Sequence, residues 1–336
     1  MDRKITSFPI KNQKIIDKSH FHNDKRRTFA YMITELSILI PTYNHVCLPL
    51  VKTLQRQASS VEGLSYELLV ADDGSTDKET VEVNRAINVY EHCRLIECPE
   101  NRGRACIRNF LAQQSSGKWL LFLDSNMVVE RSDYIAHYVR LLKEGDNAPI
   151  LYGGYTIPDK DDQSLRYELE RKNIQNRDYR LRQGKAYQNF HTSNFIVRRE
   201  VALAHPFDER FRHYGYEDVL WGKTLEQHHI GITHVDNPLR FEDFQSNATF
   251  LRKSNEAMET LYLFRKELAG YSALLALTDK LNAFHLSPIL ARLFTLGREK
   301  MEQRLIKPDA PLWLFNLYRI GRMSELFSKT TNNNQS

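Results

Sequence analysis

Short apolar segments alternate with stretches of helical spacing along the first half of the chain. The apolar segments predict strands at residues 36–40, 66–71, 93–98, 119–123 and 150–152. Helical spacing falls between them, near residues 46–59, 77–90, 103–115 and 131–144. Strands that alternate with helices of about 10–15 residues are typical of a mostly parallel sheet with helices on both faces. The pattern therefore predicts an α/β fold for this half.

The second half begins with a strongly charged stretch of helical spacing at 163–184, which predicts an exposed helix or lid. Strand-like patterns at 189–197 and 230–235 follow, and helical spacing continues from about residue 250. Met32 stands just before the first predicted strand, so translation starting there is an alternative to Met1. We interpret the chain as a flexible basic arm (1–34), one domain of two halves (35–155 and 156–250), a helical C-terminal extension (251–329) and a disordered tail (330–336).

Composition is ordinary for a folded protein of 336 residues, with 41% hydrophobic and 26% charged residues. The net charge of +5 suits phosphate-bearing substrates or an anionic membrane surface, and no dense basic stripe indicates nucleic acid. The apolar runs are far shorter than the roughly 20 residues that cross a bilayer, and no secretory signal is evident. Four scattered cysteines are expected to be free thiols, so we expect a cytoplasmic protein.

Polar residues follow three of the predicted strands, at the edge of a parallel sheet where ligands bind. The first strand leads into Pro41-Thr42-Tyr43-Asn44, and the second leads into Asp72-Asp73-Gly74. Carboxylates at this edge can accept hydrogen bonds from a base or ribose, although an Asx turn with a helix cap explains the acidic segment equally well. The fourth strand leads into Asp124-Ser125-Asn126. Such oxygens can hold Mg²⁺ or Mn²⁺ against a diphosphate, and the alternative is a plain turn.

Paired carboxylates open another predicted helix. Glu217 and Asp218 stand between the aromatic residues Tyr216 and Trp221 in a segment rich in glycine. Aromatic rings can stack on a sugar while an acid takes a hydroxyl proton. The alternative explanation is that acids are favoured in the first turn of a helix by its dipole.

Together these segments resemble the inverting glycosyltransferases of family 2, which have the GT-A fold. Residues 36–44 look like the family's opening strand with its Pro-x-Tyr-Asn signature, and Asp72 to Asp77 match its Asp-Asp-Gly-Ser-x-Asp element. Residues 101–109, with Ala-x-x-Arg-Asn at their end, match its Asn-x-Gly…Ala-Arg-Asn helix, and Asp124 to Asn126 stand at its metal-binding Asp-x-Asp. Residues 192–195 and 215–222 resemble its acceptor half, so the likeness runs from about 36 to 250.

The resemblance implies transfer of a sugar from a nucleotide-sugar, by prior a UDP-sugar, to a glycan or lipid-linked hydroxyl with inversion. Bacterial surface polysaccharide synthesis is the implied setting. Asp218 would be the general base and Glu217 would position the acceptor, together with Asn194, Tyr216 and Trp221. Asp124 and Asn126 would hold Mn²⁺ or Mg²⁺. The implied donor-binding residues are Pro41, Thr42, Tyr43, Asn44, Asp72, Asp73, Arg104, Arg108, Asp124 and Ser125.

Two departures from the family pattern concern the metal. Asn126 stands where the family usually has a second aspartate, and Phe241 stands where it often has a metal-binding histidine. We expect weakened metal binding, or compensation by Arg240, Glu242 or Asp243.

The sequence also leaves rival functions and a second role for the C-terminal helices to consider. A non-catalytic relative that binds sugars or nucleotide-sugars is the main rival to the enzyme. Nucleotidyltransferases and dinucleotide oxidoreductases are disfavoured because no glycine-rich phosphate loop follows a strand. The C-terminal helices are expected to pack on the domain, and the alternative is a face at 284–327 that contacts membrane peripherally.

Overall fold

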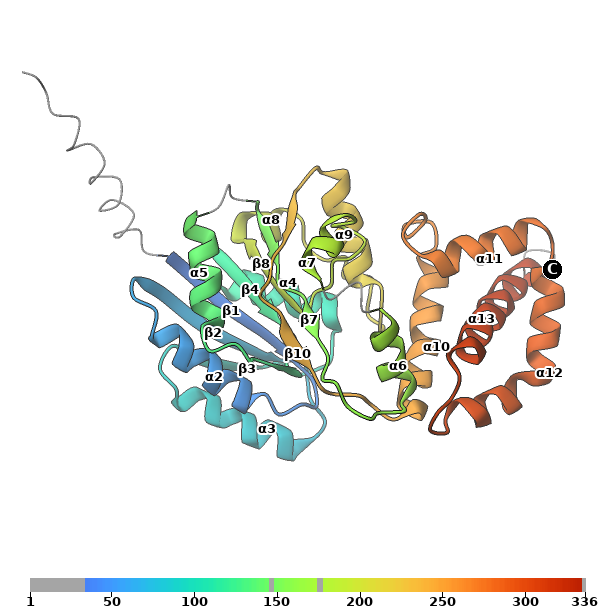
Figure 1. Cartoon of the computed structure of the whole chain (residues 1–336), viewed down its shortest axis with the longest axis horizontal. Helices are drawn as coiled ribbons and strands as arrows, with labels where there is room; N and C mark the ends of the chain where they lie inside the picture. The colour runs from blue at the N-terminus through green and yellow to red at the C-terminus, as the bar shows by residue number, and fades with distance from the viewer. Residues whose placement is uncertain (1–33, 145–147, 174–177, 334–336) are drawn as a thin grey trace, which may run out of the picture. The chain divides into compact units, whose positions relative to one another are not determined.

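The computed structural model describes residues 34–144, 148–173 and 178–333, and these belong to one compact unit. Apart from Thr34, the predicted N-terminal arm lies outside the described residues. The confirmed class is α/β: within the described residues a mostly parallel seven-stranded sheet lies between layers of helices (Figure 1).

The larger sheet has the strand order β3-β2-β1-β4-β8-β6-β9. All neighbours in it run parallel except that β8 is antiparallel to both β4 and β6. The predicted strands of the first half are present with small shifts of their ends. The strands are β1 (Thr34–Thr42), β2 (Leu64–Asp72), β3 (Cys93–Glu97), β4 (Trp119–Leu123), β6 (Ile150–Tyr152), β8 (Asn194–Arg198) and β9 (Ile232–His234).

Helices cover both faces of this sheet because strand side chains alternate between them. On β1, Ile38 and Ile40 belong to one buried cluster, whereas Leu39 belongs to the other. These clusters form the core on the two faces. The helices of this region are α2 (Leu48–Ser59), α3 (Lys78–Arg85), the 3-10 turn η2 (Ala86–Val89), α4 (Arg104–Gln114), α5 (Tyr134–Glu144), α8 (Arg199–Ala204) and α9 (Glu217–Gln227).

A second, three-stranded sheet was not predicted from the sequence. Its order is β5-β10-β7, with β10 antiparallel to β5 and parallel to β7. Strands of two or three residues carry too little alternation to be recognised in a sequence. The strands are β5 (Met127–Val128), β7 (Tyr155–Thr156) and β10 (Leu239–Phe241).

The charged stretch at 163–184 is not an exposed helix throughout. It contains α6 (Leu165–Lys172) and α7 (Tyr179–Gln183), with residues 174–177 outside the described set. Leu165 and Tyr167 are buried, and the guanidinium of Arg182 lies inside the protein, where it donates to Gly153 O at 3.1 Å. The prediction of an exposed lid is therefore wrong for these side chains.

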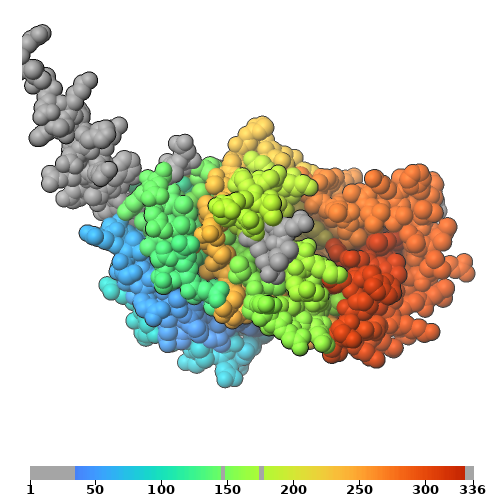
Figure 2. All heavy atoms as spheres, in the orientation of Figure 1, coloured from blue at the N-terminus to red at the C-terminus, as the bar shows by residue number. Residues whose placement is uncertain are grey.

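The C-terminal extension is helical as predicted, and Figure 2 shows it as the orange-to-red region. Phe315 and Tyr318 pack inward, whereas Trp313 and Leu317 of the same helix are exposed. The last helix continues to Asn333, so the expected disordered tail is helical over 330–333, and residues 334–336 lie outside the described set. No described helix is both long and apolar enough to span a membrane. The helices are α10 (Asn247–Leu263), α11 (Ala273–Ala283), α12 (Ser287–Leu305) and α13 (Leu312–Asn333).

Candidate functional site

The segments that follow β1, β2 and β4 line one cavity of about 570 Å³, which we call the strand-end cavity. Its position follows from the parallel sheet, because the carboxyl ends of these strands share one edge. Of the predicted donor-binding residues, those lining this cavity are Pro41, Thr42, Tyr43, Asn44, Asp73, Arg104, Arg108, Asp124 and Ser125.

Asp72 is the predicted donor residue that does not line the strand-end cavity. It is 5% exposed, and its Oδ1 accepts hydrogen bonds from the Ser75 backbone N–H at 3.2 Å and from the Ser75 hydroxyl at 2.5 Å. These contacts close a local turn between Asp72 and the residue three positions on, so a structural role accounts for Asp72. Gly74 follows with φ of +69°, and a Cβ there would meet the Glu100 backbone at 2.4 Å.

Asp73 joins the second strand to the start of α4. Its two carboxylate oxygens accept hydrogen bonds from the backbone N–H groups of Arg102 and Gly103, at 3.0 and 2.9 Å. Asn44 joins the first and second segments in the same way, since its Oδ1 accepts from the backbone N–H groups of Thr76 and Asp77. The floor of the strand-end cavity is thus built from loops that are hydrogen-bonded to one another.

A second cavity of about 430 Å³ lies beside the start of α9, and we call it the α9 cavity. Glu217, Asp218 and Tyr216 line it. Gly215 and Tyr216 both have positive φ, 100° and 69°, so the chain turns sharply just before the helix. A non-glycine residue in this conformation is strained, and such strain is concentrated at functional sites.

The two cavities meet at a shared wall. Asp124, Asn126 and Asp243 belong to it, so the end of β4 faces both cavities. Two basic side chains lie on one aromatic ring of this wall: Arg104 is 5.0 Å and Lys253 is 5.5 Å from the centre of the Tyr214 ring. The residues that line both cavities are Arg104, Asp124, Asn126, Tyr214, Asp243, Gln245 and Lys253.

Arg108 connects the acids of the two cavities from within. Its side chain is 1% exposed, with Nη2 at 2.7 Å from Asp124 Oδ1 and Nη1 at 3.3 Å from Glu217 Oε1. Although Arg108 lines the strand-end cavity, its guanidinium is committed to these two carboxylates. Arg104 is different, because its side chain is 49% exposed and lies 4.0 Å from Glu217.

Glu217 and Asp218 are adjacent in sequence but have different surroundings. Burial and the neighbouring charge of Asp218 raise the pKa of Glu217, against the opposing effect of Arg104 and Arg108. Burial also opposes ionisation of Asp218, yet a hydrogen bond from His191 and its charge bring the pKa of Asp218 below its usual value. Asp218 is therefore the acid that is ionised and partly open to the cavity, with 21% of its side chain exposed.

His191 was missed by sequence reasoning. It stands directly before the recognised Thr192-Ser193-Asn194 segment, but its contact with Asp218 spans 27 residues of sequence. No local pattern marks such a pair, so only its position next to a family motif could have drawn attention to it.

Two residues assigned to the acceptor belong to the protein interior instead. Asn194 is fully buried: Tyr134 and Tyr138 donate hydroxyl hydrogen bonds to its Oδ1, and its Nδ2 donates to Gly154 O and Asn237 O. These contacts use its polar atoms to hold the sheet's edge, and Asn194 lines neither cavity.

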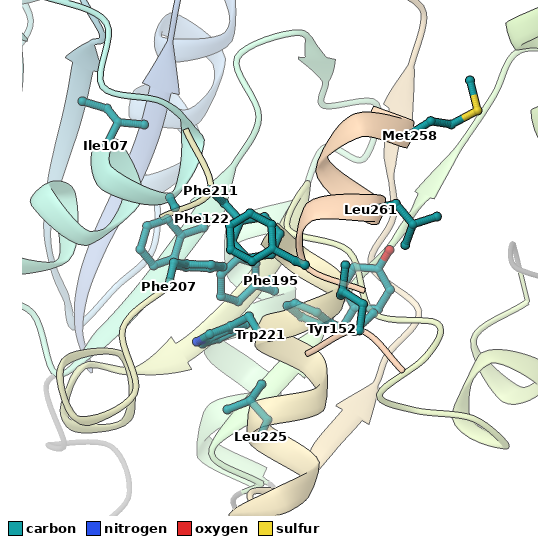
Figure 3. Close-up of a cluster of buried hydrophobic side chains, with 14 of the residues drawn as sticks. Ile107, Phe122, Tyr152, Phe195, Phe207, Phe211, Trp221, Leu225, Met258 and Leu261 are labelled. Carbon is teal, nitrogen blue, oxygen red and sulfur yellow. The ribbon is translucent and has the colours of Figure 1, made fainter. Parts of the chain in front are cut away.

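Trp221 also belongs to the protein interior and not to an acceptor site. It is 2% exposed and its ring stacks on Phe207 at 4.6 Å between centroids. Figure 3 shows it among Phe195, Phe207 and Leu225, in the core beneath α9. Its indole N–H donates to His205 O at 2.7 Å, which completes its burial. It cannot serve as a platform for a sugar.

The oxygen atoms of Asp124, Asn126 and Asp243 at the shared wall suit a divalent cation that a phosphate-bearing ligand helps to hold. Asn126 Nδ2 lies 3.5 Å from Asp243 Oδ2, so the amide and this carboxylate already face each other beside Asp124. Mg²⁺ and Mn²⁺ favour few protein carboxylates with phosphate oxygens completing the shell. Within residues 34–144, 148–173 and 178–333, no group of three or more His, Cys, Asp or Glu side chains is arranged to hold a metal unaided. Arg240 and Glu242 pair with each other, and Arg240 also pairs with Glu130. Of the three residues expected to compensate, Asp243 is the one that belongs to the shared wall.

Comparison with known proteins identifies a family for this sequence. The family model described as glycosyl transferase family 2 matches residues 37–204. An uncharacterized glycosyltransferase of Haemophilus influenzae is 34% identical over 105 residues, which are 30% of this chain and 38% of that protein. A second from the same organism is 37% identical over 93 residues, which are 27% of this chain and 29% of that protein. The aligned segment thus spans well under half the length of each relative.

The fold also resembles solved structures. A mannosyltransferase from Pyrobaculum calidifontis, solved with GDP-Man and Mn²⁺, superimposes with a TM-score of 0.54. The superposition covers 91% of this chain and 94% of that one, at 15% identity. At this identity the likeness establishes the fold, and it gives no information about the substrate.

Replacing Arg108 with alanine is expected to destabilise the protein by about 3–5 kcal/mol, because Asp124 and Glu217 would face each other without their buried counter-charge. Urea unfolding measures this change. The matched control is Arg85→Ala, which removes an exposed ion pair with Glu97 and should cost about 0–1 kcal/mol. A loss below 1 kcal/mol for Arg108→Ala would show that the buried pair does not hold the site together.

Proposed function

The chain belongs to glycosyl transferase family 2, and from that premise we propose that it transfers a sugar from a nucleotide-sugar to an acceptor hydroxyl with inversion. The donor is proposed to be a UDP-sugar, and the acceptor a glycan or lipid-linked sugar of a bacterial surface polysaccharide. The observation that carries the proposal is the meeting of the two cavities at Asp124, with Asp218 on the far side of that wall.

In this proposal the nucleoside occupies the strand-end cavity, against Thr42 and Asp73. Its diphosphate reaches the shared wall, and the sugar points into the α9 cavity. The acceptor hydroxyl lies beside Asp218. The carboxylate of Asp218 takes the hydroxyl proton while the hydroxyl oxygen attacks the anomeric carbon. The bond from that carbon to the diphosphate breaks, and the electron pair leaves with the diphosphate. Attack opposite the leaving group inverts the anomeric centre.

Asp218 has the properties of the base in this scheme. It is ionised and partly exposed, whereas Glu217 is 4% exposed and paired with Arg108. Glu217 therefore acts as a positioning residue through the buried arginine. Asp124, Asn126 and Asp243 would hold a bound Mn²⁺ or Mg²⁺, which would supply positive charge for the departing diphosphate. Arg104 and Lys253 line the same wall and contribute charge there.

Asp218→Asn is expected to lower kcat about 10²- to 10⁴-fold, because an amide cannot accept the acceptor's proton. Release of nucleoside diphosphate measures the rate. The control is Asp279→Asn on α11, an exposed acid outside both cavities, which should leave kcat unchanged. Unaltered turnover in Asp218→Asn would remove the assigned base. Absence of turnover by the unaltered chain with a wide donor panel would favour the rival, a non-catalytic binding protein.

Nucleotide and metal binding can be measured without turnover. We expect UDP to raise the melting temperature more than GDP, CDP or dTDP, since a ligand that binds the native state stabilises it according to its concentration over Kd. Mn²⁺ should add a small increment in the unaltered chain and a larger one in Asn126→Asp. The added carboxylate would face Asp243 and repel it until a cation binds. An equal metal increment in both proteins would place the cation away from Asn126.

We also propose peripheral membrane contact through the C-terminal helices, within residues 284–327. Ile289, Leu293 and Leu296 are 59%, 61% and 77% exposed at helical spacing on α12, and Phe284 just before it is 75% exposed. Residues 247–333 contain 13 lysines and arginines against 8 acids. An apolar stripe on a basic segment suits an anionic lipid surface.

Leu293→Ser with Leu296→Ser is expected to weaken binding to vesicles containing anionic lipid about tenfold or more, since a buried leucine contributes roughly 1.5–3 kcal/mol. Vesicle flotation at low and high salt measures the bound fraction. Val89→Ser is the control, because Val89 is 79% exposed in η2, outside the C-terminal helices. Equal flotation of all three proteins would exclude a membrane role for this face.

A further inference from the structure

His191 contacts Asp218, the acid that takes a proton in the proposed reaction. It lies in the loop before β8 and lines the α9 cavity, with its Nδ1 at 3.2 Å from Asp218 Oδ2. The other oxygen, Oδ1, accepts the backbone N–H of Val219 at 2.8 Å. Both oxygens of Asp218 therefore have a fixed donor, and the rotamer of the carboxylate is set by these two contacts.

The two adjacent acids of α9 each have their own cation. Arg108 contacts Glu217, and His191 contacts Asp218. Two neighbouring carboxylates in a partly buried site would otherwise raise the pKa of one another. Because Arg108 lies on the Glu217 side, it does not replace His191 as the direct partner of Asp218.

The acids around His191 favour its charged form, and Arg166 opposes it. Asp218 comes from α9, and Glu170 and Arg166 come from α6, where Arg166 Nη2 lies 2.6 Å from Glu170 Oε1. From the sheets, the Tyr155 ring packs edge-on at 6.2 Å, and burial lowers the pKa of His234 to about 4, which leaves that imidazole neutral. Burial lowers the pKa of His191 too, but the hydrogen bond to Asp218 and the charges of Asp218 and Glu170 more than offset this and raise it.

We propose that His191 is the positioning residue of the catalytic base: its Nδ1–H holds the Asp218 carboxylate towards the acceptor and supplies the positive charge that keeps it ionised. This proposal rests on the proposed function, in which Asp218 takes the acceptor proton. No covalent step involves His191, and the transferred proton ends on Asp218 before it passes to solvent.

The pH dependence follows from the sign of the two effects. The hydrogen bond and the charge of His191 lower the pKa of Asp218 against the effect of burial, so without His191 this pKa rises and the carboxylate takes up its proton at a higher pH. The acid limb of the kcat/KM profile, where the ionised base is lost, then moves to a higher pH. The alkaline limb is little affected. A change in folding alone would instead lower the rate evenly at every pH.

The first test compares kcat/KM against pH for the unaltered chain, His191→Leu and His191→Gln. In His191→Leu the midpoint of the acid limb should move up by about one pH unit or more, the usual effect of an opposite charge at this distance. His191→Gln keeps a donor without a charge, so it should recover part of kcat while its acid limb stays shifted. Stabilisation by UDP should be the same in all three, because His191 does not line the strand-end cavity. An acid limb that does not move in His191→Leu overturns the proposal.

A second test does not need turnover, so it separates this proposal from the proposed function. Among the 12 histidines, the NMR signal missing in His191→Leu identifies His191. We expect this signal to titrate above 6.5 in the unaltered chain and to titrate lower by about one pH unit or more in Asp218→Asn. The same midpoint in both proteins would refute the pairing, even if the enzyme proves active with Asp218 as its base. A shifted midpoint in a protein without turnover would retain the pairing and refute the reaction.

Discussion

A single buried guanidinium fixes the positions of the two cavities relative to each other. Arg108 comes from α4, is 1% exposed, and reaches Asp124 at the end of β4 and Glu217 at the start of α9. A charge at that depth is tolerated only when its partners stay in place, because an unpaired buried ion costs several kcal/mol. The planar fork of arginine also fixes the direction of both contacts. Three elements that are distant in sequence are thereby fixed at one point.

That constraint determines where Asp218 lies. Glu217 precedes it on the same helical turn, so holding Glu217 against Arg108 turns the next side chain towards the α9 cavity and His191. The left-handed conformation of Tyr216 places the start of the helix at this point, and the stacked core around Trp221 supports it from below. Trp221, which the family resemblance assigns to the acceptor, thus serves the site indirectly, by keeping the helix that carries Asp218 in one position.

The sequence was sufficient for the elements and the strand ends, but it could not distinguish cavity side chains from core side chains. The pattern at 119–123 identifies β4 to the residue, and with the parallel order it places Asp124 at the sheet's edge. Asn194 and Trp221 were misassigned because an amide or an indole in a family motif has the same appearance in sequence whether it faces a ligand or the core. His191 and Asp243 act through contacts over 27 and 117 residues, and no local periodicity encodes such pairs.

In the proposed function, the shared wall would compensate for Asn126 and Phe241, which stand where the family resemblance implies metal ligands. Burial and the charge of Arg104 lower the pKa of Lys253, and both cations lie on the Tyr214 ring. A diphosphate bound there would meet these two side chains as well as the oxygens of Asp124, Asn126 and Asp243. Its anionic charge would relieve the repulsion between Arg104 and Lys253, whereas the carboxylates of Asp124 and Asp243 would repel it unless a cation lies between them. In the proposed function, an amide at position 126 would reduce this repulsion and weaken the contribution of a metal ion, while the contribution of Arg104 and Lys253 would remain.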